Sequence, residues 1–343
     1  MGKTVSQSNG IEALLVEFEK VEQQVKNKKK EKLFIADQLA SLAESLDSKE
    51  RSLLLTKVAD LLSVDEMTER LTRLLSQNKV PLINVASFKN LLVQATRKRQ
   101  LFDYQPEWQL NNKLAAYKFV DTLGIKRPKV YAFNKRLENI EYKKGTVLKP
   151  EHGSSSQGVF VLDQKGGAFE VRTGEMLSSK QELTTRAQAL LNSGVIKKNA
   201  WFLEEFIGDF DEKGTPLPPV DLKFYCFFGE VGIVMEIERS NTTRYCEWLA
   251  DGTLTETGIY EDKKFLGQGF TEDQISLAKK ISRNIFAPFV RIDFIKGKNQ
   301  FSFGEFTPRP GHFSSFNKEF DQRLGEFYLK AESRLLKSLI KDN

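Results

Sequence analysis

Two acidic residues near the C-terminal end of the chain could hold a metal ion. Asp293 lies in the run Arg291-Ile-Asp-Phe-Ile and Glu305 in Phe303-Gly-Glu-Phe-Thr, with a polar segment at 296–300 between them. These β-rich runs predict two antiparallel strands joined by a hairpin, which would set the two carboxylates side by side. No neutralising partner is obvious, and such a pair suits Mg²⁺ bound together with phosphate oxygens. A surface hairpin with two solvated acids would show the same pattern.

A glycine- and serine-rich loop lies between two further predicted strands. Lys149 ends the first strand, and the loop at 153–158 offers backbone N–H groups and three hydroxyls. These groups can hold phosphate oxygens, and glycine lets the backbone approach an anion closely. The segment is not a P-loop, because the Gly-x-x-x-x-Gly-Lys-[Ser/Thr] pattern is absent. A flexible turn would have the same composition.

Two other segments, at 200–208 and 111–128, also combine structural and polar signals. In the run at 200–208, Glu204 and Glu205 interrupt apolar residues before Gly208 leads into a polar loop. In the segment at 111–128, Asn112 can cap a helix whose apolar positions recur at helical spacing until Gly124 ends it.

In this order, the four segments resemble the ATP-grasp superfamily and share motifs with D-alanine–D-alanine ligases. A closer resemblance is to the TupA-like ATP-grasp family, which is associated with cell-surface polysaccharide biosynthesis. It covers about residues 106–330. The resemblance implies an α/β (α+β) ATP-grasp fold in which two antiparallel-sheet subdomains clamp ATP. The implied domains are 106–208, with the phosphate loop, and 209–343, with the metal site, after an all-helical N-terminal domain at 1–105.

The resemblance also implies site residues, with ATP and Mg²⁺ as cofactors. Those implied to bind ATP are Lys113, Lys149, Gly153, Ser154, Ser155, Ser156, Gly158, Glu204, Glu205, Phe206, Ile207 and Asp211, with Asp209 as an alternative for the ribose. Those implied to act in catalysis are Lys223, Arg291 and Arg309, and the implied metal ligands are Asp293, Glu305 and Thr307. The ligases have an asparagine metal ligand where this chain has Thr307, which leaves the number of metal ions open. They also have a glutamate in place of Gly153.

The implied activity is that of an ATP-dependent ligase. A carboxylate would become an acyl phosphate, and an amine would attack it. The expected substrate is a carboxylate-bearing cell-surface or capsular glycan, or an amino acid, joined to an amine. Two alternatives remain: a kinase that phosphorylates a glycan or small-molecule hydroxyl, and a non-catalytic nucleotide-binding scaffold. The scheme needs no protein nucleophile, and no serine–histidine or cysteine–histidine arrangement stands out among only two histidines and two cysteines.

The N-terminal third is different in kind. Residues 11–101 are rich in helix-forming types, and Ile11, Leu14, Phe18, Val21 and Val25 repeat at three- and four-residue intervals. We expect the charged run at 27–32 to interrupt this helix and several amphipathic helices to follow. A helical bundle or an oligomerisation element is predicted, so a homo-oligomer is an expected partner state.

Composition limits the remaining classes. The chain has 343 residues, a formal net charge of +6 and no apolar run of the length that spans a bilayer. The two cysteines form no metal pattern, which favours a reducing cytoplasmic location. Charged runs such as 28–32 and 97–99 could attract an anionic glycan or the inner face of a membrane. No signature of sequence-specific nucleic-acid binding accompanies them.

Overall fold

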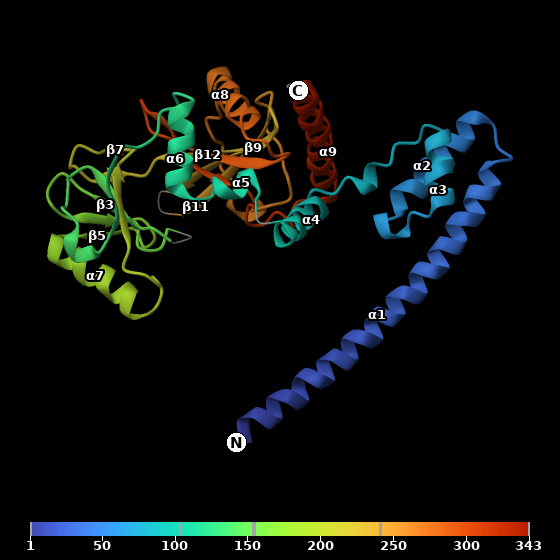
Figure 1. The fold of residues 1–343 in the computed structure, drawn as a ribbon, viewed down its shortest axis with the longest axis horizontal. Coiled ribbons are helices and arrows are strands. Elements are labelled where there is room, and N and C mark those ends of the chain that lie inside the picture. Colours follow the sequence, from blue (N-terminus) through green and yellow to red (C-terminus); the bar gives the residue numbers. More distant parts are fainter. Residues whose placement is uncertain (1, 103, 153–155, 240–241, 342–343) are drawn as a thin grey trace. The chain divides into compact units, whose positions relative to one another are not determined.

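The structure is a computed structural model that describes residues 2–102, 104–152, 156–239 and 242–341. The chain divides into two compact units, Met1–Ser87 and Phe88–Asn343. The smaller unit is helical, whereas the larger one contains all the described strands (Figure 1).

The smaller unit is built on one long helix. Its elements are α1 (Gly2–Ala43), α2 (Ser48–Leu61), η1 (Val64–Glu66), α3 (Glu69–Gln77) and η2 (Ile83–Val85). Asp47 begins α2, because its carboxylate accepts hydrogen bonds from the backbone N–H groups of Lys49 and Glu50. The last turns of α1 pack on α2 and α3 around buried small and aliphatic side chains such as Ala40 and Leu71.

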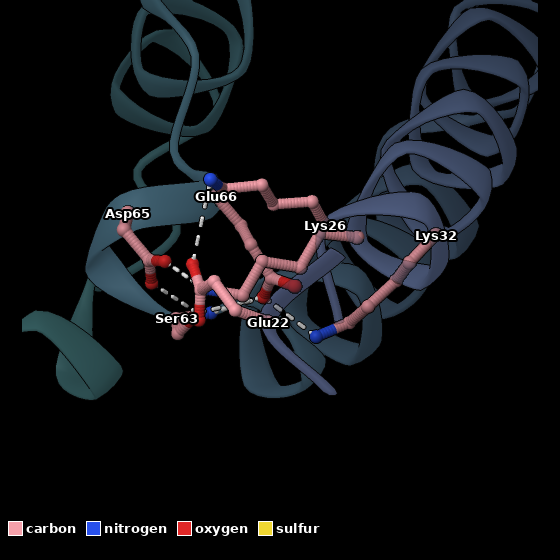
Figure 2. Close-up of polar contacts among 7 residues, drawn as sticks. Glu22, Lys26, Lys32, Ser63, Asp65 and Glu66 are labelled. Atoms are coloured by element: carbon pink, nitrogen blue, oxygen red, sulfur yellow. Dashed lines mark hydrogen bonds and ion pairs between the residues drawn. The ribbon is translucent and has the colours of Figure 1, made fainter. Parts of the chain in front are cut away.

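The predicted interruption at 27–32 is wrong, since α1 runs through it without a break. Lysine and glutamate are good helix formers, and Lys28 forms an ion pair with Glu31 one turn away. On the same stretch, Lys32 Nζ lies 2.6 Å from Glu66 Oε2 (Figure 2). Glu66 is buried and also accepts the backbone N–H of Ser63 in a capping box. The charged run therefore attaches α1 to η1.

The larger unit contains a six-stranded antiparallel sheet in the order β1-β6-β2-β3-β4-β5. Its strands are β1 (Val130–Lys135), β2 (Thr146–Pro150), β3 (Phe160–Leu162), β4 (Ala168–Glu170), β5 (Glu175–Leu177) and β6 (Trp201–Glu205). Helix α7 (Lys180–Asn192) covers one face, where Leu183 and Ala187 pack against Leu148 and Trp201 (Figure 1). A short η3 (Leu137–Asn139) follows β1.

A second, five-stranded antiparallel sheet has the order β11-β10-β9-β12-β13. Its strands are β9 (Val220–Phe227), β10 (Glu230–Arg239), β11 (Thr243–Leu249), β12 (Val290–Lys296) and β13 (Phe301–Thr307). Helices α6 (Lys113–Thr122) and α8 (Glu272–Arg283) cover one face, on which Phe224 and Ile292 are fully buried. A small hairpin, β7 (Asp209–Phe210) and β8 (Pro216–Leu217), links the two sheets along the chain, and η4 (Glu261–Lys263) follows β11.

The opposite face of this sheet is covered at one end by α4 (Phe88–Leu101) and α9 (Lys318–Lys341). Phe88 is completely buried against Tyr225, Phe227 and Phe289. Helix α4 falls within the range 1–105 expected to form the N-terminal domain, yet it packs against α9 in the larger unit. A short α5 (Pro106–Gln109) follows it. No helix among the described residues is long and apolar enough to cross a membrane.

Candidate active site

A continuous cleft lies between the two sheets of the larger unit. One part of it, about 370 Å³, is lined mainly by charged and polar residues: Lys113, Lys149, Pro150, Ser156, Gln157, Val159, Asp221, Lys223, Arg239, Asp293, Phe294, Ile295, Gly304 and Glu305. A second part of about 270 Å³ shares Lys149, Ser156, Arg239 and Glu305 with the first, so the two are continuous. Both strands that carry the acids and the strand that carries Lys149 therefore contribute to one cavity.

The two acids lie side by side, as the sequence predicts. Strands β12 and β13 pair with Asp293 directly opposite Glu305. Glu305 is exposed and lines both parts of the cleft, whereas Asp293 is buried. The pair thus has one carboxylate facing the cavity and one set into its wall.

The expectation that these acids lack a neutralising partner is wrong. Arg291 donates to both oxygens of Asp293, from Nε to Oδ1 and from Nη2 to Oδ2, each at 2.6 Å. Lys223 Nζ also pairs with Asp293 Oδ2. Lys223 lies opposite Asp293 on β9, a neighbour that only the sheet register reveals. Burial opposes ionisation of Asp293, but Arg291 and Lys223 outweigh it and lower its pKa to about 2.

On the other side of the cleft, Glu204 is the buried centre of a second charged group. Lys149 Nζ forms an ion pair with Glu204 Oε1, and the Tyr117 hydroxyl donates to Oε2 at 2.9 Å. Lys113, the first residue of α6, is placed here by the Asn112 cap, which accepts the backbone N–H of Leu114 and so confirms the predicted helix start.

Burial and the charge of Glu204 shift the pKa values of Lys113 and Lys149 in opposite directions. Burial lowers the pKa of Lys149 to about 8, although Glu204 opposes the shift. For Lys113, burial also acts to lower the pKa, but the charges of Glu204 and Glu305 together with Tyr117 outweigh it and raise the pKa above its usual range. Lys149 is therefore the first of the two to lose its proton as pH rises.

The second part of the cleft has an apolar wall suited to a flat heterocycle. Val147, Val161 and Phe169 come from the six-stranded sheet, and Phe206 and Ile207 from the segment after β6. This segment is the predicted hinge, and all four of its residues, Glu204, Glu205, Phe206 and Ile207, line the pocket. The buried side chain of Glu204 also has an ionic role that the sequence did not indicate.

The structure does not bring every expected residue to the cleft. Asp211 closes the turn between β7 and β8, where its Oδ1 accepts the backbone N–H groups of Lys213 and Thr215. Asp209 instead accepts the backbone N–H of Lys298. The guanidinium of Arg309 lies 5.8 Å from the centre of the Trp108 ring, beside a small pocket away from the cleft. These side chains do not line either part of the cavity.

Other expected residues lie in or just behind the cavity wall. Arg291 Nη2 donates a 2.9 Å hydrogen bond to Thr307 Oγ1. These two residues pair across β12 and β13, two positions along the strands from the pair Asp293 and Glu305. Ser156 lines the cavity, and the buried Gly158 has a positive φ of 68° with no room for a Cβ, which would lie 2.6 Å from Ile196 Cδ1. Gly153, Ser154 and Ser155 lie outside the described residues.

Several polar residues of the site, among them Asp221 and Tyr117, do not follow from the sequence patterns. Asp221 lines the cavity and accepts a 2.7 Å hydrogen bond from Arg239 Nη1. Tyr117 lies on the helix that Asn112 caps and fits the apolar spacing of that helix. The alternation of Asp221 and Lys223 on one strand could have indicated the first, because such residues share a face. Nothing local marks Tyr117, because its partner lies 87 residues away.

Comparison with protein families decides the family. A family model described as TupA-like ATP-grasp matches residues 92–329, more than two thirds of the chain. The chain belongs to the TupA-like ATP-grasp family. This TupA-like protein is therefore a member of the ATP-grasp superfamily.

No curated protein matches the chain. Among solved structures, it is similar to D-alanine–D-alanine ligase from Bacillus anthracis complexed with ATP, with 14% identity, a TM-score of 0.42, and coverage of 72% of this chain and 75% of that one. It is also similar to the ligase of the same name from Helicobacter pylori, with 18% identity, a TM-score of 0.38, and coverage of 64% and 58%. A third is the ATP-grasp ligase PsnB complexed with a phosphomimetic variant of its minimal precursor, Mg and ADP, with 10% identity, a TM-score of 0.40, and coverage of 66% and 60%.

The residues of the cleft fit Mg²⁺ held together with a nucleotide. Within the described part of the chain, no group of three or more His, Cys, Asp or Glu side chains could hold a metal ion by itself. The two adjacent carboxylates Asp293 and Glu305 are the number of protein ligands that Mg²⁺ commonly takes when phosphates and water supply the rest. The low pKa of Asp293 keeps it ionised and able to coordinate.

Proposed function

We propose that this protein is a carboxylate–amine ligase that works through an acyl phosphate, and that it modifies a cell-surface or capsular glycan by joining an amine to a uronic acid or similar group. One observation carries the proposal: Lys113, Lys149 and Lys223 line the same cavity as the Asp293–Glu305 pair. A triphosphate needs such cations, and a carboxylate placed beside it needs its own charge offset before it can react.

The reaction balances with ATP as a substrate. A carboxylate oxygen attacks the γ-phosphorus, the bond from that phosphorus to the bridging oxygen breaks, and ADP leaves. The amine nitrogen then attacks the acyl carbon, the carbon–oxygen bond to phosphate breaks, and the amine proton passes to solvent. Lys113 and Lys149 would bind phosphate oxygens, and Lys223 with Arg291 would offset charge that builds on the transferring group. Asp293 and Glu305 would hold Mg²⁺, which neutralises phosphate charge when bound.

The two cysteines support a route without a protein thiol nucleophile. Cys226 and Cys246 are both buried. Burial raises the pKa of each thiol, that of Cys226 well above its usual value. A nucleophilic cysteine needs the opposite shift, because the thiolate is the reactive form. Direct attack of substrate on ATP is therefore the chemistry that these residues favour.

Hydroxylamine trapping tests the proposal. The protein is incubated with ATP, Mg²⁺, hydroxylamine and carboxylated saccharides such as galacturonic acid oligomers. A ligase yields a hydroxamate together with ADP and phosphate, because hydroxylamine intercepts the acyl phosphate. A kinase yields a stable phosphorylated sugar and no hydroxamate, and a scaffold binds ATP without turnover. Either of the last two results would overturn the proposal.

We also propose that α1 pairs with α1 of a second copy. Ile11, Leu14, Phe18, Val21 and Val25 form an apolar stripe, and each side chain is at least 43% exposed. Residues 10–24 carry four glutamates and one lysine, whereas 25–32 carry five lysines and one glutamate. An antiparallel pair would set each acidic half against a basic half.

Light scattering of the full chain tests this pairing. The expected mass is that of a dimer, and Leu14→Lys together with Phe18→Lys should give a monomer with the same helix content in the rest of the unit. A wild-type chain that is monomeric at all concentrations measured would reject the pairing. Serine substitutions of the exposed Leu53 and Leu61, on α2, are the matched control and should leave the dimer intact.

A further inference from the structure

A third pocket opens beside the nucleotide cleft and has no role in the chemistry derived so far. It measures about 710 Å³ and is lined by Ser156, Phe169, Val171, Arg172, Thr173, Gly174, Arg239, Thr242, Thr243, Tyr245, Tyr260 and His312. Ser156 and Arg239 line both this pocket and the nucleotide cleft. A ligand in the third pocket would therefore lie next to the phosphate-binding groups.

The charged side chains that line this pocket are positive. Arg172 and Arg239 are its charged side chains, and among the described residues that line it there is no aspartate or glutamate. The carboxylate that pairs with Arg239, Asp221, lines the nucleotide cleft instead. A guanidinium binds carboxylates in a planar, two-point geometry, so the pocket is suited to an anion.

The pocket also has a flat aromatic surface. The rings of Tyr245 and Tyr260 stack with their centres 3.7 Å apart and their planes at 5°. The His312 ring lies edge-on to Tyr260, with centres 5.4 Å apart. Tyr260 and His312 both have left-handed backbones with φ of 58°, a conformation that is uncommon for tyrosine and more common for histidine.

The remaining groups favour a hydroxylated ligand. The hydroxyls of Thr173, Thr242 and Thr243 can each donate and accept a hydrogen bond. The volume is about twice that of the charged part of the nucleotide cleft, more than a small amino acid needs. Cation, stacked rings and hydroxyls together match a sugar ring that carries a negative charge.

We infer that this pocket, which we name the tyrosine pocket, binds the carboxylate-bearing substrate, and that this substrate is an anionic sugar. The inference rests on the proposed ligase function and locates the binding site of its carboxylate-bearing sugar. Arg239, at the boundary of the two cavities, orients the sugar carboxylate toward the phosphate-binding lysines, and Arg172 holds the far side of the same ligand. The ring lies against the tyrosine pair.

Binding experiments on the full chain test the inference. Digalacturonic acid is titrated against the protein by calorimetry or saturation-transfer NMR, with digalactose, glucose 6-phosphate and alanine as comparison ligands. We expect digalacturonic acid to bind and digalactose and alanine not to bind. Arg172→Gln should weaken the binding of digalacturonic acid by about tenfold, while the affinity for ATP stays within about twofold of the wild-type value.

Two further variants separate binding from folding. His312→Asn should weaken the sugar but keep the fold, because asparagine tolerates the left-handed backbone. Tyr245→Leu removes one ring of the stacked pair and should weaken binding of the sugar more than His312→Asn does. Lys197→Gln is the matched control, an exposed cation that lines no part of either cavity, and it should change nothing.

The outcomes separate this inference from the proposed function. Equal binding of digalactose, preferential binding of glucose 6-phosphate, absence of digalacturonic acid binding, or unchanged binding in Arg172→Gln would each overturn the inference. Sugar binding that depends on Arg172, without any hydroxamate in the trapping assay, would keep the tyrosine pocket and reject the ligase. Hydroxamate formed with an amino acid alone would keep the ligase and reject the pocket as its substrate site.

Discussion

The two walls of the nucleotide cleft share one arrangement of charges but differ in the residues that lie beside it. Each contains a buried carboxylate set between two cations: Glu204 with Lys113 and Lys149 on one side, and Asp293 with Lys223 and Arg291 on the other. On the five-stranded sheet, a second carboxylate, Glu305, stands exposed beside the first. On the six-stranded sheet, that place is taken by the apolar surface of Val147 and Val161.

This difference indicates a division of work. On each wall of the cleft, the buried carboxylate fixes the positions of its neighbouring cations, because a buried charge must be paired. On the five-stranded side, Glu305 adds a second carboxylate, so that Asp293 and Glu305 can hold Mg²⁺ together. On the six-stranded side, Val147 and Val161 add an apolar surface for a base. Charges that hold the structure together and charges that act on ligands should therefore respond differently to substitution.

The largest effects are expected on the metal side. Glu305→Gln and Asp293→Asn should each lower Mg²⁺-dependent ATP turnover, measured as phosphate release, by about 10³-fold, because a carboxylate ligand is lost. Their stabilities should differ. Asp293→Asn leaves two buried cations without their partner and should cost about 3–5 kcal/mol of unfolding free energy, whereas Glu305→Gln, at an exposed site, should change it by less than about 0.5 kcal/mol.

Urea unfolding and turnover are measured on the same samples. The control is Glu238→Gln, which breaks an ion pair with Arg244 on the same sheet away from the cavity and should change turnover little. Near-normal turnover in Glu305→Gln would remove it from the metal site. Equal destabilisation by both substitutions would contradict the division between structural and ligand-binding charge.

The second prediction concerns the six-stranded side. Lys149→Ala should weaken ATP binding by about 10- to 100-fold, because a buried cation facing the phosphates is lost. Calorimetry with ATP and Mg²⁺ measures this, and Lys198→Ala, at an exposed position, is the control. An unchanged dissociation constant would assign Lys149 a purely structural role with Glu204.

The third prediction follows from the lowered pKa of Lys149, about 8. The ammonium is charged below this pH and neutral above it, so ATP binding must restore the proton at higher pH. The dissociation constant for ATP should therefore rise by up to about tenfold per pH unit above pH 8 and stay flat below it. In Lys149→Arg, the guanidinium stays charged and the dependence should disappear. A dependence that persists in this variant would locate the titrating group elsewhere.

The smallest effect is expected at Tyr117. Tyr117→Phe removes the hydroxyl that donates to Glu204, while Lys149 still pairs with the same carboxylate. The loss should be about 1–2 kcal/mol of unfolding free energy, with little change in ATP affinity. Chemical unfolding and ATP titration measure the two, and a large loss of affinity would show that Tyr117 positions a ligand-binding group.

The local parts of the site could be predicted from the sequence. The hairpin of Asp293 and Glu305, the strand that ends at Lys149 and the helix capped by Asn112 follow from strand alternation, turn residues and capping preference. Each depends on residues close in the chain, where short-range rules apply.

Contacts between distant segments could not be predicted. The partners of Asp293 and Glu204 include residues 70 and 87 positions away, which a sequence pattern does not connect. The charged run in α1 was misjudged for the same reason, because Lys32 is matched by Glu66 of a later element. Asp211 was assigned by analogy to the ribose, but the chain uses it to close a turn.

The position of Phe88 limits where this chain can be truncated. Its ring is wholly enclosed among Tyr225, Phe227, Phe289 and Phe316, although it precedes the family match, which begins at residue 92. A fragment trimmed to the family boundary would expose the apolar lining of that hollow to water. Any fragment that is to keep this core covered must therefore start at or before Phe88, and the family match is shorter than the compact unit Phe88–Asn343.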